Sequence, residues 1–430
     1  MVSAPVGVNR VGHLHGGITI VGPGVAADGS TNIISPAMKI IEVTNVDFSL
    51  RQFLLPLMRA IRARGHDVIG ACAESGTFLE VPRAEGFRIV DIPFERNMSP
   101  LAHWQAFLAL SRLFREEKPD LVHAHMPISG FLTRMAAWWA GVPRIACTGH
   151  GFWFNYPGNP ARRAVGFLME WIAARVTTVF LTVSDEEAND ARRLRISGHA
   201  VSVGNGRDPS VFQPDAVARS RVRVTLDVPE ETVVIVTVSR LVRLKGYPEL
   251  AAAMRDVPDA ELWVVGERLY SDRGDDMLAL LRNAGLGERL RLLGYRTDVA
   301  AVLAAADIFV LPSHFEGLPM SVIEAMLTGL PVVASNIRGP REQVVPEVTG
   351  ILVPPGDAQS LADALNQLVG DPAARTAMGT AGRERALEHY DEAKVLARTL
   401  ELLGIPDLGD GASASEAPPA AVASNAKQPS

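Results

Sequence analysis

Two glutamates, Glu316 and Glu324, flank a point where an apolar strand pattern changes to a helix pattern. Residues 306–312 predict a buried strand, residues 320–327 predict a helix, and Gly317-Leu-Pro319 forms the short loop between them. Such a junction presents free backbone N–H groups and the positive end of the helix dipole, which together favour an anion. A carboxylate there would repel a phosphate. We therefore expect Glu316 and Glu324 to accept hydrogen bonds from hydroxyl groups, such as those of a ribose or a hexose.

Each glutamate also has a simpler interpretation, which stays open at this point. Ser321 and Glu324 have the spacing of a capping box, in which both side chains would bond N–H groups at the helix start. Glu316 could be a solvated loop acid.

A basic loop follows the strand predicted at residues 232–239. It carries Arg240, Arg243 and Lys245. An arginine fork and a mobile lysine charge at the end of a strand could neutralise a leaving diphosphate, and stabilising the charge that grows as a sugar departs is usually the largest catalytic contribution. We interpret Arg240 and Lys245 as phosphate ligands and Arg243 as solvated. A plain surface loop is the alternative.

Three histidines follow predicted strands. His123 and His125 lie on one face of a strand end, and His150 stands in the segment Thr148-Gly-His-Gly151. A two-histidine metal site is conceivable, but no third ligand is evident in the sequence. We therefore interpret His123 and His125 as lining a cleft or bonding loop backbone.

Small and aromatic residues near these loops are further candidates. Gly266 ends the strand predicted at residues 260–265, where a glycine permits close approach of a ligand, although a plain turn would also use one. Phe152, Trp153 and Phe154 could form an apolar platform for a sugar or a lipid, or pack in the core.

The segment from Ser313 to Glu324 resembles the Glu-x7-Glu signature of the retaining family 4 glycosyltransferases, which have the GT-B fold. The resemblance continues in register through residues 329–335 and 350–357. Many members carry a Gly-Gly loop after the first strand, whereas this chain has Asn45-Val-Asp-Phe48 there. Together with Phe53-Leu-Leu-Pro-Leu57, this departure looks like the bacterial subgroup that builds capsular, exopolysaccharide and other lipid-linked glycans.

The resemblance implies roles for the candidate residues. Arg240 and Lys245 would hold the diphosphate of a nucleotide sugar, Glu324 the ribose and Glu316 the transferred hexose. His150 would face the donor sugar and hydrogen-bond it as charge develops. The implied catalytic set is His150, Glu316, Arg240 and Lys245, and the implied donor site adds Gly266, Gly317, Leu318 and Glu324.

No Asp-x-Asp tripeptide, the usual metal-binding motif of the other common glycosyltransferase fold, occurs in the sequence. We expect the positive side chains and the helix start to replace a metal, so we predict no cofactor and no required metal.

The elements that must position these residues alternate along the chain. Strand patterns at 38–44, 66–72, 87–92, 121–124, 144–148 and 178–183 alternate with helix patterns, which predicts a parallel, doubly wound sheet. A second series has strands at 232–239, 260–265, 290–293, 308–311 and 331–334.

We therefore predict two Rossmann-like α/β domains facing across a cleft. The first is an acceptor-side domain at 38–204, and the second is a nucleotide-sugar-binding domain at 205–390. The resemblance implies that a helix at 391–404 packs back on the first domain. Residues 1–37 and 405–430 read as a disordered lead and tail.

Composition excludes several classes of protein. The chain has 430 residues, 47% of them hydrophobic, and a net charge of −6, which argues against a general nucleic-acid binder. The two cysteines stand apart, without a metal or disulfide spacing. No apolar run reaches the length of a membrane span, and the N-terminus does not read as a secretory signal.

These observations predict a retaining glycosyltransferase. It would move a hexose from a nucleoside diphosphate sugar to an acceptor hydroxyl, on an undecaprenyl-diphosphate-linked oligosaccharide of exopolysaccharide or capsule synthesis. We expect it in the cytoplasm, peripheral on the inner membrane. A soluble sugar or sugar-phosphate acceptor, a nucleotide-sugar epimerase and a nucleotide-sugar-binding non-enzyme stay open. A dinucleotide-dependent oxidoreductase does not fit, because neither first strand is followed by Gly-x-Gly-x-x-Gly.

Overall fold

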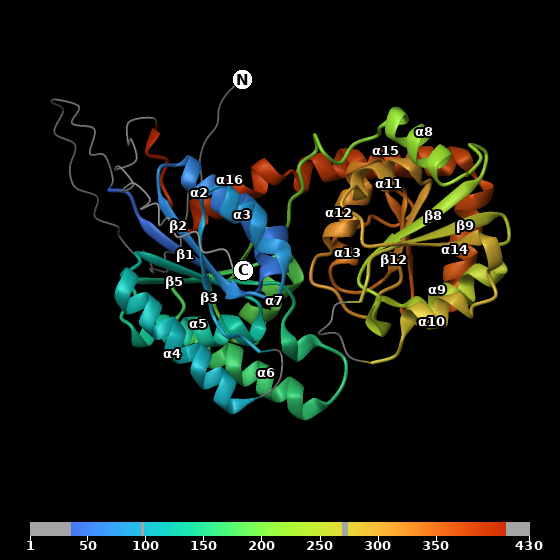
Figure 1. Ribbon diagram of the computed structural model, residues 1–430. Helices are drawn as coiled ribbons and strands as arrows, with labels where there is room; N and C mark the ends of the chain where they lie inside the picture. Colours follow the sequence, from blue (N-terminus) through green and yellow to red (C-terminus); the bar gives the residue numbers. More distant parts are fainter. Residues whose placement is uncertain (1–35, 96–98, 269–273, 410–430) are drawn as a thin grey trace, which may run out of the picture. The chain divides into compact units, whose positions relative to one another are not determined.

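The computed structural model describes residues 36–95, 99–268 and 274–409, and these residues form two parallel sheets (Figure 1). The first sheet has seven strands in the order β3-β2-β1-β4-β5-β6-β7. Its strands are β1 (Lys39–Val46), β2 (Asp67–Ala73), β3 (Arg88–Asp91), β4 (Leu121–His125), β5 (Arg144–Gly149), β6 (Val179–Thr182) and β7 (Val201–Ser202). The second sheet has six strands in the order β10-β9-β8-β11-β12-β13. They are β8 (Val233–Val238), β9 (Ala260–Val265), β10 (Leu290–Gly294), β11 (Ile308–Leu311), β12 (Val332–Ser335) and β13 (Gly350–Val353).

Helices connect the strands of the first sheet. They are α1 (Asp47–Ser49), α2 (Leu55–Ala63), α3 (Glu80–Ala84), α4 (Pro100–Glu117), α5 (Pro127–Trp139), α6 (Pro160–Ala173) and α7 (Asp185–Arg193). Right-handed crossovers place α4, α5 and α6 on one face of this sheet and α2 and α3 on the other (Figure 1). A π-helical turn, Leu50–Leu54, joins α1 to α2.

The second sheet is covered in the same way. Its helices are α8 (Ala216–Thr225), α9 (Tyr247–Ala253), α10 (Met277–Arg282), α11 (Val299–Ala305), α12 (Met320–Leu327), α13 (Pro340–Gln343), α14 (Ala358–Gly370) and α15 (Pro372–His389). One apolar core lies between the sheet and α9, α10 and α14. A second lies on the opposite face, beneath α11, α12 and α15. Strands covered on both faces need apolar side chains in both directions, which explains why the central strands β8, β11 and β12 are almost wholly apolar.

The last helix, α16 (Glu392–Leu402), returns to the first sheet, where it packs on α2. Leu400 and Leu403 belong to the same core as Ile40 of β1. The predicted tail starts too early, because Ile405 is also buried in that core. The carbonyl of Pro406 lies 2.7 Å from Nε2 of His66. Residues 1–35 and 410–430, which hold most of the predicted lead and tail, lie outside the described residues.

The predicted strands and helices of both series are present within a few residues, and the fold is the predicted pair of doubly wound sheets. The elements α1, α7, β7, α8 and α13 were not predicted. Residues 350–357, for which no strand was predicted, begin with β13 at the edge of the second sheet. A strand of four residues beside a turn has too few side chains to show a period.

Candidate active site

Two loops meet at the carboxyl edge of the second sheet, because β8 and β11 are neighbouring parallel strands. The loop after β8 carries Lys245, and the loop after β11 carries Glu316. Nζ of Lys245 lies 2.6 Å from Oε1 of Glu316, and the hydroxyl of Ser313 donates to the same oxygen at 2.7 Å. A Cβ on Gly246 would lie 1.9 Å from the carbonyl oxygen of Pro312, so only glycine allows the loops to approach this closely.

Glu316 is therefore not a solvated loop acid, since its exposed fraction is 8%. The structure brings Lys245 and Glu316 into direct contact. Arg240 lies on the same loop as Lys245 with its side chain exposed. Arg243 points elsewhere and pairs with Asp275 at 2.9 Å on an exposed surface.

Glu324 is buried in α12 and does not cap it. The N-cap of α12 is Pro319, which makes no side-chain capping bond, so the capping-box interpretation is wrong. Glu324 instead accepts a hydrogen bond from Nε of Arg207 at 2.6 Å. Nη1 of Arg207 also donates to the carbonyl of Gln52 in the first domain. Sequence reasoning missed Arg207, although an arginine directly after the Gly204-Asn-Gly206 turn was a visible signal.

Contacts within the protein account for much of the position of Gly266, Gly317 and Leu318. A Cβ on Gly266 would lie 2.0 Å from the carbonyl of Ser239, so backbone approach within the protein already requires glycine there. Leu318 is buried in the core beneath α12. A Cβ on Gly317 would lie 2.9 Å from the carbonyl oxygen of His150, so the loop before α12 lies directly against the first domain's histidine loop.

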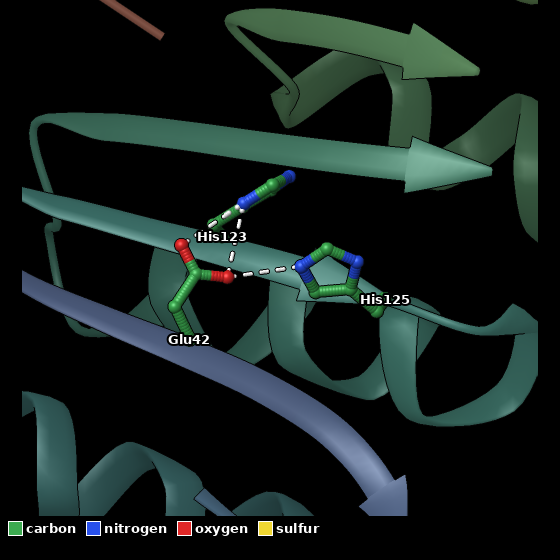
Figure 2. A group of neighbouring side chains, drawn as sticks. All are labelled: Glu42, His123 and His125. Carbon is green, nitrogen blue, oxygen red and sulfur yellow. Dashed lines mark hydrogen bonds and ion pairs between the residues drawn. The ribbon is translucent and has the colours of Figure 1, made fainter. Parts of the chain in front are cut away.

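The first domain contributes a buried chain of hydrogen bonds that begins at Glu42 in β1 (Figure 2). One carboxylate oxygen of Glu42 lies 3.0 Å from Nδ1 of His123 and 2.9 Å from Nε2 of His125. Nε2 of His123 lies 2.8 Å from the hydroxyl of Thr148. Nδ1 of His125 lies 3.1 Å from Nε2 of His150, so the chain reaches the predicted catalytic histidine.

The sequence showed no third ligand-type residue beside His123 and His125, and this was wrong. In the structure Glu42 lies beside both histidines. Their ligand-type atoms all lie within 4.8 Å of one another. We interpret the group as a hydrogen-bond network, because the ring nitrogens already have partners in Glu42, Thr148 and His150. The signal that sequence reasoning overlooked is a glutamate inside the otherwise apolar run Ile40-Ile-Glu-Val43. A buried carboxylate needs a partner.

Burial and neighbouring charge shift the pKa values along this chain. Burial alone would raise the pKa of Glu42, but the charge and hydrogen bonds of His123 and His125 lower it to about 2. Burial, reinforced by the charge of His123, lowers the pKa of His125 to about 4 against the pull of Glu42. Burial and the charges of the other two histidines lower the pKa of His150 to about 3. At neutral pH His125 and His150 are uncharged.

A cavity of about 80 Å³ opens beside this histidine chain. His125 and His150 line it from the first domain, Met320 from α12 and Arg207 from the linker, and Val395 of α16 closes another side. Phe152 and Phe154 are buried in a core cluster, so they pack rather than form an open platform.

Charged groups also join the two domains beside the site. The carboxylate of Glu342 in α13 accepts the backbone N–H groups of Asp185 and Glu186, both at 2.8 Å, and so caps α7 of the first domain. Arg338 pairs with Asp190 at 2.7 Å. Glu187 is buried beside them and accepts the N–H of Phe152 at 2.8 Å, and burial raises its pKa to about 8.

No helix in the described part of the chain is long and apolar enough to cross a membrane.

Two doubly wound sheets, with facing loops at the carboxyl ends of their strands, form the GT-B fold of glycosyltransferases. The family model described as Glycosyltransferase Family 4 matches residues 52–211, and the one described as Glycosyl transferases group 1 matches residues 219–385. The UDP-Gal:alpha-D-GlcNAc-diphosphoundecaprenol alpha-1,3-galactosyltransferase of Escherichia coli is 32% identical over 71% of this chain and 80% of its own length. The chain belongs to the family 4 glycosyltransferases, as its Glu-x7-Glu segment predicted.

Two further similarities agree with this assignment. The N,N'-diacetylbacillosaminyl-diphospho-undecaprenol alpha-1,3-N-acetylgalactosaminyltransferase of Campylobacter jejuni is 24% identical over 85% of this chain and 98% of its own length. The crystal structure of Anabaena HepE in complex with UDP and glucose has a TM-score of 0.73 and 21% identity, covering 85% of this chain and 99% of HepE. The structural similarity supports the fold.

Proposed function

We propose that this enzyme is a retaining hexosyltransferase that uses a nucleoside diphosphate sugar. Its acceptor is a hydroxyl on an undecaprenyl-diphosphate-linked oligosaccharide in exopolysaccharide or capsule biosynthesis, and it works in the cytoplasm on the inner membrane surface. The acceptor class is supported by the names of the Escherichia coli and Campylobacter jejuni relatives, both of which act on undecaprenol-linked sugars. The observation that carries the donor class is the contact of Lys245 with Glu316 at the start of α12.

We assign the following roles to the residues of the site. Arg240 and Lys245 bind the diphosphate and stabilise its charge as the bond to the sugar breaks. The loop Gly317-Leu318 adds the helix start to the same anion site. Glu316 accepts hydroxyls of the hexose, and Glu324 those of the ribose, with Arg207 holding the Glu324 carboxylate in place.

The reaction exchanges one bond at the anomeric carbon for another. The bond from that carbon to the diphosphate oxygen breaks, and the acceptor oxygen forms its bond on the same face. The proton of the acceptor hydroxyl passes to the departing phosphate oxygen, so no protein base is needed. His150 hydrogen-bonds the donor sugar. Because Lys245, Arg240 and the α12 start supply positive charge, we propose that no metal is required.

Binding of nucleotides tests this donor assignment. Thermal unfolding of the purified chain would be followed with UDP, GDP, ADP and NAD, each without metal. One nucleoside diphosphate should raise the midpoint, since a ligand at about 100 times its dissociation constant adds about 2.7 kcal/mol of stability. A shift with NAD alone, or with none of the four, would contradict the proposal.

A further inference from the structure

Helix α6 is amphipathic, but its apolar side faces outward rather than toward the sheet. Its outward stripe is apolar and exposed, whereas its single carboxylate, Glu170, points inward. There Glu170 accepts two hydrogen bonds from Nη2 of Arg134, both at 2.9 Å. The exposed stripe has the helical spacing i, i+3, i+4, i+7 and comprises Ala161, Ala164, Val165, Leu168, Trp171 and Ile172. A helix that covers a sheet normally turns its polar side to water, so this stripe needs another partner.

Neighbouring helices extend this apolar surface. On α4, Leu101, Trp104 and Leu108 are exposed along one stripe, and their exposed fractions are 67%, 58% and 48%. The helices α4 and α6 both pack against α5, on the same face of the first sheet. Every exposed tryptophan among the described residues lies on these three helices: Trp104, Trp138, Trp139 and Trp171.

The exposed charges on α6 itself and directly after its end are positive. Arg162 and Arg163 stand at the start of α6, and Arg175 follows its end, where it covers the ring of Trp171 at 4.3 Å. Tryptophan and leucine with flanking arginine, on a helix without exposed acid, match the boundary of an anionic bilayer.

We propose that the outward face of α4 and α6 is a docking surface for an anionic lipid bilayer. The inference deepens the proposed function, since a lipid-linked acceptor is reached from the bilayer, but vesicle binding is measured without any transfer reaction. A failure of docking is therefore distinct from a failure of the enzyme assignment.

Co-sedimentation of the full chain with vesicles tests the surface. Vesicles containing phosphatidylglycerol should carry the protein down, and pure phosphatidylcholine vesicles should carry much less. Leu168→Glu should weaken binding about ten-fold or more, because it places a charge in the apolar stripe. Arg162→Gln should weaken it about five-fold, the factor equivalent to about 1 kcal/mol for one basic residue near the surface.

Val224→Glu on α8 is the matched control, since Val224 has an exposed fraction of 78% but lies on the second domain. It should bind vesicles as the unaltered chain does. Three results would overturn the proposal. Leu168→Glu could bind vesicles as well as the unaltered chain does, the unaltered chain could fail to bind phosphatidylglycerol vesicles, or it could form a dimer that Leu168→Glu converts to a monomer. The last result would assign the surface to a second copy of the chain.

A different observation, the chain of hydrogen bonds from Glu42 to His150, carries a second inference. An ionised carboxylate only accepts, so Nε2 of His125 must donate to Glu42. An uncharged His125 then has an unprotonated Nδ1, which accepts the N–H at Nε2 of His150. An uncharged His150 in turn has no proton on Nδ1.

We infer that Glu42 and His125 are positioning residues that fix His150 in one tautomer, with a proton on Nε2 and a lone pair on Nδ1. His150 then accepts a hydrogen bond from a sugar hydroxyl through Nδ1 and cannot donate one there. This inference deepens the role proposed for His150, but its tautomer can be observed without substrate.

Nuclear magnetic resonance of the full chain with 15N-labelled histidine tests the tautomer directly. The ring signals that vanish in His150→Gln belong to His150. They should show protonated Nε2 and unprotonated Nδ1 from pH 6 to 8. A proton on Nδ1, or a charged ring in that range, would overturn the inference.

Glu42→Gln supplies a second readout, since a carboxamide can donate to one histidine and disturb the order of protons. It should change the His150 tautomer and lower kcat with little change in the donor KM. His199→Gln alters an exposed histidine and should change neither. An unchanged His150 tautomer in a folded Glu42→Gln protein would contradict the role of Glu42.

Discussion

Nζ of Lys245 and Oε1 of Glu316 lie 2.6 Å apart, although they come from loops after two different strands of the second sheet. The contact joins the residue proposed to bind the diphosphate to the residue proposed to bind the hexose. These two groups of a nucleotide sugar are themselves adjacent, so one ion pair spans the bond that is to be broken.

Lys245→Ala should weaken binding of the nucleoside diphosphate. A hydrogen bond to a charged group contributes roughly 1.5–3 kcal/mol, which corresponds to about ten-fold to a hundred-fold in affinity. Titration calorimetry with the nucleotide that stabilises the protein measures this change. Arg243→Ala is the control, because Arg243 lies on the same loop but pairs outward with Asp275. Equal affinity for Lys245→Ala and the unaltered protein would exclude the diphosphate role.

Glu316→Gln should lower turnover by orders of magnitude and leave nucleotide affinity nearly unchanged. The amide keeps the shape but loses the charge that orders Lys245 and accepts the sugar hydroxyls. Turnover by product formation and affinity by calorimetry are compared on the same preparation. Normal turnover would show that Glu316 does not act on the hexose.

Glu324→Ala should destabilise the protein even without ligand. It leaves Arg207, with an exposed fraction of 7%, without its buried partner, and breaking such a pair costs about 3–5 kcal/mol. Urea unfolding monitored by fluorescence measures the change. The double variant Arg207→Met, Glu324→Met removes both charges and should recover much of the loss. If Glu324→Ala alone unfolds like the unaltered chain, the ion pair contributes little.

Glu187→Gln should stabilise the protein more at pH 8 than at pH 5. Burial raises the pKa of Glu187 to about 8 from a usual value of 4.5. Between these values the folded state holds a proton that the unfolded state has released, so this group's contribution to stability falls as pH rises, by about 1.4 kcal/mol per pH unit at most. An uncharged glutamine lacks this dependence. Unfolding free energies of both proteins across this range give the difference, which should grow with pH; a constant difference would refute the shifted pKa.

Much of this architecture could be predicted from local patterns. Strongly apolar, β-branched runs such as residues 232–239 indicated the central strands, since strands covered on both faces need them. The Glu-x7-Glu segment marked the site because its two glutamates are fixed by one strand-to-helix junction. The elements α7, β7 and α8 were missed, although α7 and α8 carry local start signals in the capping side chains of Ser184 and Asp215. What could not be predicted is that Glu342, far along the chain, accepts two further N–H groups at the start of α7.

The partners of the site residues could not be predicted for a similar reason. Glu42 and His125 are far apart in sequence and meet only because β1 and β4 are adjacent in the sheet. Arg207 reaches Glu324 only after the linker has brought it to α12. Sequence motifs identify residues within one loop, whereas these contacts depend on strand order.

Transfer of a sugar to a lipid-linked acceptor tests the central claim most directly. The purified chain would be incubated without metal, with the nucleotide hexose whose nucleoside diphosphate stabilises it and with undecaprenyl-diphosphate-linked oligosaccharide acceptors. The product would be analysed by mass spectrometry and by its anomeric proton signal. We predict an acceptor-dependent product that gains one hexose, keeps the anomeric configuration of the donor, and is lost in Glu316→Gln. Three results would contradict this claim: conversion of the donor without acceptor, inversion of the anomeric centre, or no product with any nucleotide hexose that the protein binds.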